Sequence, residues 1–210
     1  WERVPQPTRA EHVKLLIPLL EKNRDEIAQL YVKEQGKTLA QAYGEIDKSI
    51  SFIDYMTSLS MSDKGRVLQN SIANETIQII NKPIGVTAGI VPWNAPILVL
   101  MRKVIPAIVT GCSVVIKPSE ETTLLTLRLA ELFRASTIPA GLIQIVPGTG
   151  ETVGTQLAQH KDIQLISLTG SMRAGKSVYE HAAQTVKKVN LELGGNAPVI
   201  VTPHADIDKA

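Results

Sequence analysis

Several polar residues follow apolar segments of this sequence and could carry out chemistry there. Asn94 has an amide that can donate two hydrogen bonds to a developing oxyanion. Lys117 and Glu120 can donate to and accept from the hydroxyls of a ribose. Glu192 closes an apolar segment and could act as a general base, with a pKa raised by apolar surroundings.

The segment 163–177 has the pattern of an apolar strand, a glycine turn and the start of a helix. Such a turn directs backbone N–H groups and the positive end of a helix dipole toward one point, which suits a phosphate. Gly170, Gly175, Lys176 and Ser177 match the P-loop pattern G-x-x-x-x-G-K-S. The same turn could hold the pyrophosphate of a dinucleotide, so two interpretations are open at this point.

The single cysteine and the four histidines of the chain point away from thiol and metal chemistry. Cys112 directly precedes the apolar segment 113–117 and has no histidine near it in sequence, so we interpret it as a buried structural thiol. The histidines lack metal-ligand spacing, which predicts no metal site. One cysteine provides no disulfide framework and favours a reducing, cytoplasmic setting.

The composition is that of a globular protein with a sizeable core. The chain has 210 residues, of which 44% are hydrophobic and 20% charged, and its net charge is +2. No block of like charges indicates a nucleic-acid partner, and the longest apolar run, 95–101, is too short to span a membrane.

The elements that must position the polar residues change character along the chain. Apolar residues recur at helical spacing through residues 8–60, with a kink expected at Pro18, a capping box at Asn23 and Glu26, and a C-cap at Gly36. Residues 75–79 alternate like a half-exposed strand. Beyond residue 83 the pattern alternates between strands and helices. Strands are expected at 86–91, 113–117, 142–146, 188–193 and 198–201 and from residue 163. Helices are expected at 96–110, 122–135 and 151–159, up to about residue 184 after the strand from residue 163, and from 206 to 210.

This alternation predicts an α/β fold with a Rossmann-like, mostly parallel sheet and helices on both faces, preceded by a helical N-terminal segment. Such sheets bind ligands beyond the carboxyl ends of their strands, where the polar residues above are expected.

Four of these clusters together resemble the aldehyde dehydrogenase superfamily in order and approximate spacing. They are Ile90-Val-Pro-Trp-Asn94, Lys117-Pro-Ser-Glu120, Leu168-Thr-Gly-Ser171 and Glu192-Leu-Gly-Gly195. The resemblance runs from about residue 9 to the end of the chain. It is strongest to the branch that oxidises small hydroxyaldehydes such as lactaldehyde or glycolaldehyde, which the segment 148–154 also resembles.

The resemblance implies that an active-site cysteine attacks an aldehyde, that hydride passes to a nicotinamide, and that water hydrolyses the resulting thioester. It implies catalytic roles for Asn94, which would hold the oxyanion, and Glu192, which would activate the water. Because Glu120 would repel a 2′-phosphate, NAD is expected as the cofactor rather than NADP. The cofactor-binding residues that the resemblance implies are Ile90, Val91, Pro92, Trp93, Lys117, Ser119, Glu120, Gly148, Gly150, Thr169, Gly170, Ser171, Leu193 and Gly194.

The sequence also departs from the family pattern. The family's nucleophilic cysteine would lie beyond Ala210, so we expect the chain to be a fragment that is inactive alone, with a base and half of an oxyanion hole. Asn196 stands where a lysine is usual, and Met172 where threonine or valine is usual.

We expect four parts of the chain: a helical segment that packs on the cofactor domain (1–61), a strand and oligomerisation segment (62–82), an NAD-binding domain (83–195) and the start of a catalytic domain (196–210). The expected partners are a small aldehyde substrate and further copies of the chain in a homodimer or homotetramer.

Two other functions stay open. One is a P-loop nucleotide-binding protein that uses Gly170–Ser177, and the other is a non-catalytic NAD-binding module. A P-loop protein needs a magnesium-holding acid at the end of another strand, whereas the expected strand 198–201 is followed by Thr-Pro-His.

Overall fold

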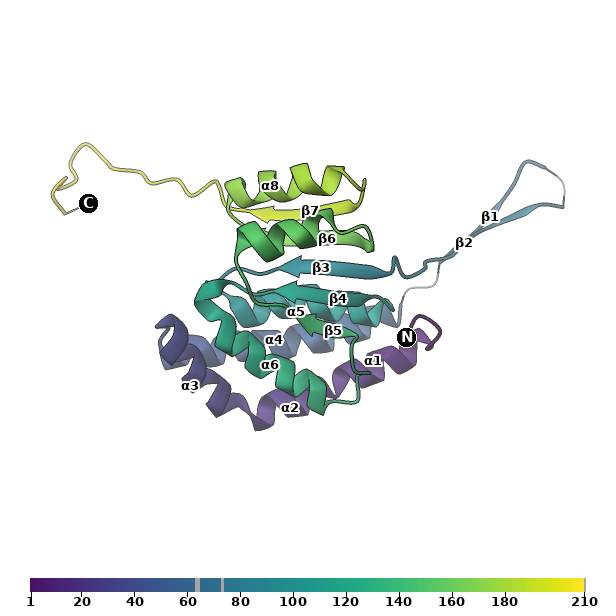
Figure 1. The fold of residues 1–210 in the computed structure, drawn as a ribbon, viewed down its shortest axis with the longest axis horizontal. Coiled ribbons are helices and arrows are strands. Elements are labelled where there is room, and N and C mark those ends of the chain that lie inside the picture. The colour runs from purple at the N-terminus through teal and green to yellow at the C-terminus, as the bar shows by residue number, and fades with distance from the viewer. Residues whose placement is uncertain (63–64, 73, 210) are drawn as a thin grey trace.

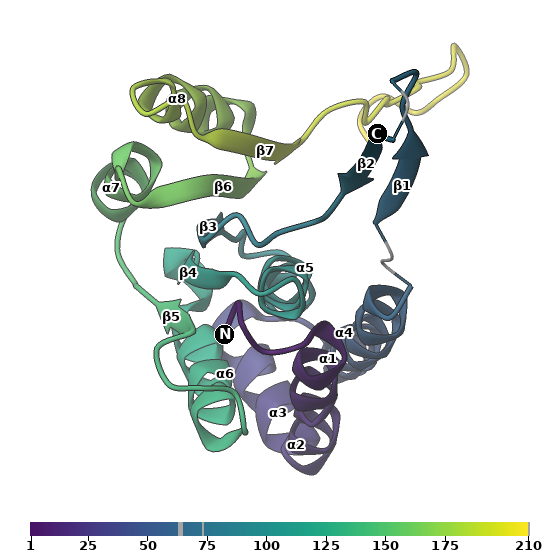
Figure 2. The ribbon, with the colours of Figure 1, turned by 90° about the vertical axis from the view of Figure 1, so that its right-hand side faces the viewer.

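A computed structural model describes residues 1–62, 65–72 and 74–209 of the chain. A parallel sheet forms the middle layer (Figures 1 and 2). Helices α1–α6 cover one face of this sheet, and α7 and α8 cover the other. The predicted α/β fold with a helical N-terminal segment is therefore confirmed.

The N-terminal segment consists of α1 (Gln6–Lys14), α2 (Leu16–Lys22), α3 (Arg24–Gln35) and α4 (Leu39–Ser60). Because Pro18 has no N–H to donate to the carbonyl of Lys14, the helical path breaks at Leu15, as the proline predicts. Gly36 ends α3 in the left-handed conformation, with a φ of 82°, and confirms the predicted C-cap.

The capping box predicted at Asn23 was wrong. The Asn23 amide instead donates to the carbonyl of Leu19 at 2.7 Å, and its oxygen accepts from Arg128 at 3.0 Å, so a tertiary contact replaces the local cap. A capping box is present at the start of α4, where the side chains of Thr38 and Gln41 exchange hydrogen bonds with the backbone.

The five-stranded sheet has the strand order β5-β4-β3-β6-β7, and all of its pairs are parallel. The chain winds outward in one direction through β3 (Val86–Ile90), β4 (Ser113–Lys117) and β5 (Ile143–Ile145). It then returns to the other side of β3 for β6 (Ile163–Gly170) and β7 (Lys188–Leu193). This reversal between β3 and β6 is a topological switch point, which opens a crevice at the carboxyl ends of the strands.

Helices α5 (Pro96–Val109) and α6 (Thr123–Ala135) connect the strands on the face that the N-terminal helices cover, with a short 3₁₀ turn η1 (Glu120–Thr122) before α6. On the other face lie a π-helical turn η2 (Gly150–Gly154), α7 (Thr155–Gln159) and α8 (Met172–Ala183). Within the described chain no helix is both long and apolar enough to cross a membrane.

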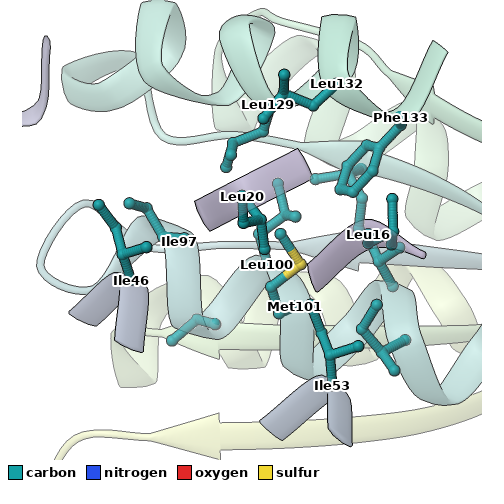
Figure 3. Packing of buried hydrophobic residues seen from close by; sticks show 14 of the residues in the cluster. Leu16, Leu20, Ile46, Ile53, Ile97, Leu100, Met101, Leu129, Leu132 and Phe133 are labelled. Atoms are coloured by element: carbon teal, nitrogen blue, oxygen red, sulfur yellow. The ribbon is translucent and has the colours of Figure 1, made fainter. Parts of the chain in front are cut away.

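The larger hydrophobic core lies between the N-terminal helices, α5, α6 and the sheet. Figure 3 shows how closely its aliphatic side chains meet. Leu16 and Leu20 of α2, Ile53 of α4 and Leu100 of α5 are essentially fully buried there. A smaller core joins the opposite face of the sheet to α7 and α8. The two cores hold the sheet rigid between them, so the strand ends are fixed in position.

Two terminal features of the sequence prediction need correction. Residues 198–201 form no strand, and Val199 and Ile200 are 88% and 85% exposed, because no described strand pairs with them. Residues 206–209 form turns rather than the start of a helix, and Ala210 lies outside the described residues.

The predicted strand at 75–79 is confirmed as β2 (Thr76–Ile79), but all four of its residues are exposed rather than every second one. It pairs with β1 (Arg66–Gln69), which the sequence pattern did not reveal. The two form an antiparallel hairpin that projects from the body of the molecule (Figure 1). Residues 63, 64 and 73 of the predicted segment 62–82 lie outside the described residues.

Candidate functional site

A large cavity lies at the carboxyl ends of β3, β4, β6 and β7, at the topological switch point. Its volume is about 1580 Å³. All but one of the residues predicted from the sequence line it: Ile90, Val91, Pro92, Trp93, Asn94, Lys117, Ser119, Glu120, Gly150, Thr169, Gly170, Ser171, Glu192, Leu193 and Gly194.

Gly148 does not line the cavity. Its φ is 144°, and a Cβ placed on it would lie 2.5 Å from a methyl group of Val153. The residue therefore allows the chain to turn tightly after β5 toward η2, and this turn brings Gly150 to the cavity.

The turn after β6 ends in the helix cap of α8. Ser171 is the N-cap, and its Oγ accepts a hydrogen bond from the N–H of Ala174 at 3.2 Å. The remaining N–H groups of the first turn have no partner within the helix, and the positive end of the helix dipole lies beside the cavity. This end of α8 can accordingly bind an anionic group.

The geometry of this turn contradicts the P-loop interpretation. Helix α8 already begins at Met172, and the Gly175 N–H donates to the Ser171 carbonyl at 2.9 Å. Lys176 and Ser177 therefore lie within the helix, whereas a P-loop needs the N–H groups before its lysine to face a phosphate. Gly175 has a packing role, because a Cβ there would lie 2.7 Å from the side chain of Leu193.

Lys117 and Glu120 are held together after β4. The Lys117 side chain is only 3% exposed, and its Nζ donates to the Pro118 carbonyl at 2.8 Å and to Glu120 Oε1 at 3.3 Å. Glu120 Oε1 also accepts from the N–H of Gly150 at 3.0 Å. Partial burial alone would raise the pKa of Glu120, but the backbone N–H groups of Glu120 and Gly150 and the Lys117 ammonium outweigh it and lower this pKa. The carboxylate is thus a charged acceptor at the edge of the cavity.

The two predicted catalytic residues approach the cavity from different strands. Asn94 follows β3, and Glu192 lies near the end of β7, where it pairs with Thr169 of β6. Both side chains are exposed to the cavity. The described residues therefore leave Glu192 open rather than enclosing it in the apolar surroundings that the sequence analysis expected.

Lys103 is a site residue that the sequence analysis missed. It lies on α5, lines the cavity, and donates to Ser167 Oγ of β6 at 2.9 Å. Burial lowers its pKa to about 8, and the charge of Glu192 partly opposes this change. Gly89 of β3 leaves room for the lysine, since a Cβ there would lie 3.0 Å from Lys103 Cδ. A recognisable signal was the pair Arg102-Lys103, which interrupts an otherwise apolar helix.

Cys112 lies away from this cavity. It precedes β4, at the amino end of the sheet, and is buried with 4% of its surface exposed. This position agrees with the structural role inferred from the sequence. Among the described residues, no cluster of three or more His, Cys, Asp or Glu side chains could hold a metal ion.

Comparison with known proteins identifies the family. The sequence profile of the aldehyde dehydrogenase family matches residues 1–210. The chain belongs to this family. It is 39% identical over 210 residues to the 3-sulfolactaldehyde dehydrogenase of Pseudomonas putida, covering 100% of this chain and 43% of that relative. It is also 39% identical over 210 residues to the NADP(+) succinate-semialdehyde dehydrogenase of Escherichia coli, covering 100% of this chain and 44% of that relative.

Solved aldehyde dehydrogenase structures share the fold. A 3,6-anhydro-L-galactose dehydrogenase in complex with NAP matches with a TM-score of 0.91 and 40% identity, over 100% of this chain and 44% of that one. A Staphylococcus aureus betaine aldehyde dehydrogenase in complex with NAD⁺ matches with a TM-score of 0.90 and 35% identity, over 93% of this chain and 39% of that one. The aldehyde dehydrogenase chain described here thus spans less than half the length of these relatives.

Proposed function

We propose that the protein containing this chain is an NAD-dependent aldehyde dehydrogenase that converts an aldehyde to a carboxylic acid through a cysteine thioester. One observation supports this proposal above the others: an amide, a carboxylate and a dinucleotide-sized set of polar groups converge on one cavity at the switch point of the sheet. In this proposal the chain supplies the cofactor site, the base and half of the oxyanion hole.

The residues at the cavity edge fit a dinucleotide. The charged Glu120 carboxylate and the adjacent Lys117 ammonium can accept from and donate to the two hydroxyls of an adenosine ribose. The N-terminus of α8 at Ser171 can bind a pyrophosphate. A nicotinamide held by these residues would supply the acceptor for the hydride that leaves the substrate carbon. A negative charge at Glu120 disfavours a 2′-phosphate, which supports NAD over NADP.

The catalytic roles follow from the chemistry of two side chains. The Asn94 amide donates a hydrogen bond to the oxygen that becomes negative when the thiolate adds to the aldehyde carbon. After hydride transfer, the Glu192 carboxylate accepts a proton from a water molecule, whose oxygen attacks the thioester carbonyl and expels the cysteine sulfur. Cys112 is buried and does not line the cavity, so in this proposal the nucleophilic cysteine is not a residue of this chain.

The sequence led us to expect a small hydroxyaldehyde such as lactaldehyde as the substrate. We now propose instead a small aldehyde that carries an acidic group at its far end. The names of the relatives describe enzymes for sulfolactaldehyde, succinate semialdehyde and glutarate semialdehyde, all of which carry a second, acidic group. Arg102 presents an exposed guanidinium at the same cavity as Asn94 and Glu192. An arginine there can bind a carboxylate or sulfonate through two parallel hydrogen bonds, which supports a small aldehyde with an anionic far end.

We also propose the domain division and assembly expected from the sequence, with segments 1–61, 62–82, 83–195 and 196–210. The β1–β2 hairpin exposes apolar side chains, among them Val67, Ile77 and Ile80, and its strand edges have no partner in the described chain beyond each other. Such edges favour pairing with another subunit in a homodimer or homotetramer.

The proposal is tested with the full gene product that contains this chain. Isothermal titrations with NAD and with Mg-ATP distinguish the dinucleotide site from a P-loop, and only NAD should bind. Turnover of lactaldehyde, succinate semialdehyde and sulfolactaldehyde is then followed through reduction of NAD. Binding of NAD without turnover of any aldehyde would instead favour the non-catalytic NAD-binding module.

A further inference from the structure

An ion pair between the partly buried Lys37 and the buried Glu45, in the N-terminal helical segment, contacts the backbone of Asn94. Lys37 follows the C-cap of α3, and its Nζ donates to Glu45 Oε2 of α4 at 2.7 Å, to the Tyr31 hydroxyl at 2.6 Å and to the Asn94 carbonyl oxygen at 2.7 Å. The Tyr31 hydroxyl in turn donates to Glu45 Oε2 at 2.6 Å. The three donors of the ammonium therefore all have acceptors.

The same carboxylate holds the start of α5. Glu45 Oε1 accepts from the N–H groups of Ile97 and Leu98 at 2.9 and 3.2 Å. The N-cap of this helix is Ala95, whose side chain makes no capping hydrogen bond. Glu45 thus supplies from α4 the acceptor that a local cap would normally provide, and its charge suits the positive end of the helix dipole.

These contacts fix the peptide group of Asn94 on both sides. Lys37 anchors its carbonyl, and Glu45 anchors the helix that begins two residues later. By contrast, the Asn94 side chain faces the cavity and makes no hydrogen bond to a described residue. The direction of its amide is therefore set through the backbone, by groups that do not themselves reach the cavity.

We propose that Lys37, Glu45 and Tyr31 form a positioning network that aims the Asn94 amide at the reacting oxygen, an inference that rests on the oxyanion role given to Asn94 above. The burial of two of its members supports a fixed geometry: Tyr31 is 0% exposed and the Glu45 side chain 7%, while the Lys37 side chain is 21% exposed. An error of about 1 Å in the placement of a catalytic group can cost on the order of 100-fold in rate.

The test uses the full gene product and removes the Lys37 contact without leaving a buried charge. The paired change Lys37→Met with Glu45→Gln eliminates both charges, and the new amide oxygen still accepts from the Ile97 N–H while its NH₂ group reaches Tyr31. We expect kcat for aldehyde oxidation to fall roughly 10- to 100-fold. The dissociation constant for NAD should change by less than about twofold, because the network does not line the cofactor part of the cavity.

A double-mutant cycle distinguishes positioning from general damage. When Asn94→Ala has already removed the amide, the paired change should lower kcat by less than about threefold, since its effect acts through Asn94. An equal loss of kcat in both backgrounds overturns the positioning network while leaving the proposed function intact. If Asn94→Ala alone leaves kcat unchanged, the oxyanion role fails, and the network's role fails with it.

Lys33→Met is the matched control, because Lys33 is an exposed lysine on α3, the helix that carries Tyr31. It should change neither kcat nor the NAD dissociation constant. A loss of NAD affinity or of thermal stability in the paired variant that accounts for its loss of kcat would assign the network to folding alone and overturn the proposal.

Discussion

Glu120→Gln gives the sharpest test of cofactor choice, because it removes one charge and keeps the shape of the side chain. The amide oxygen can still accept the N–H of Gly150, which now donates to Glu120 Oε1 at 3.0 Å. The negative charge that disfavours a 2′-phosphate is lost. We expect the preference for NAD over NADP to shrink, through tighter binding of NADP and slightly weaker binding of NAD.

The size of this effect follows from the exposure of Glu120. Two unit charges about 4 Å apart interact by about 1 kcal/mol in water and about 4 kcal/mol at an effective dielectric constant of 20. The Glu120 side chain is 50% exposed, so the repulsion lies toward the lower end of this range. A gain of about 1–2 kcal/mol corresponds to NADP binding roughly 5- to 30-fold tighter relative to NAD.

The assay is equilibrium titration of both cofactors into the full gene product at fixed ionic strength, because salt screens exposed charges. Glu121→Gln is the control, since it removes the same charge from the neighbouring exposed residue, which does not line the cavity. An unchanged ratio of the two dissociation constants in Glu120→Gln, or the same change in both variants, would refute placement of the adenosine ribose at Glu120.

Three further predictions concern the base, the buried lysine and the packing of α8. Glu192→Gln should keep the first burst of NADH but slow steady-state turnover by at least about 100-fold, and loss of the burst in rapid-mixing experiments would contradict its role in thioester hydrolysis. The pKa of Lys103 is lowered from 10.5 to about 8, so between these values the unfolded chain binds more protons and the free energy of unfolding should rise with pH. Lys103→Met should flatten that rise in urea titrations across pH 8–10.5. Gly175→Ala places a Cβ 2.7 Å from the Leu193 side chain and should cost about 1–3 kcal/mol of stability, whereas Gly44→Ala, in open space on α4, should stabilise by up to about 1 kcal/mol.

Local pattern predicted all five strands of the parallel sheet of this aldehyde dehydrogenase chain, and it also predicted a strand at 198–201 that does not form. The strand predicted at 113–117 agrees with β4, and that at 188–193 with β7. The largely buried strand β4 is a short apolar run, and the edge strand β7 alternates between exposed and half-buried residues; both signals are local. The hairpin partner β1 was missed because its residues, Arg-Val-Leu-Gln, do not alternate between polar and apolar, whereas those of β2 do. Both strands are exposed at all four residues, so burial imposes no alternation on either of them.

The sequence by itself determined which polar residues stand at strand ends, and it determined the family through the order of four short clusters. The sequence could not decide which residues of other elements lie close to these strand-end residues in the folded chain. The P-loop interpretation was excluded only by the position of the α8 N-terminus at Met172. Lys103 lines the cavity only because α5 packs across Gly89.

The contact between Lys37 and the Asn94 carbonyl likewise joins residues 57 positions apart, one from the helical segment and one from a strand end. Periodicity reports which face of an element is buried, because burial repeats with the turn of a helix or the pleat of a strand. Contacts between single polar groups on distant elements have no such repeat. The tertiary structure alone therefore decided how the strand-end residues are held, and which buried charges support them.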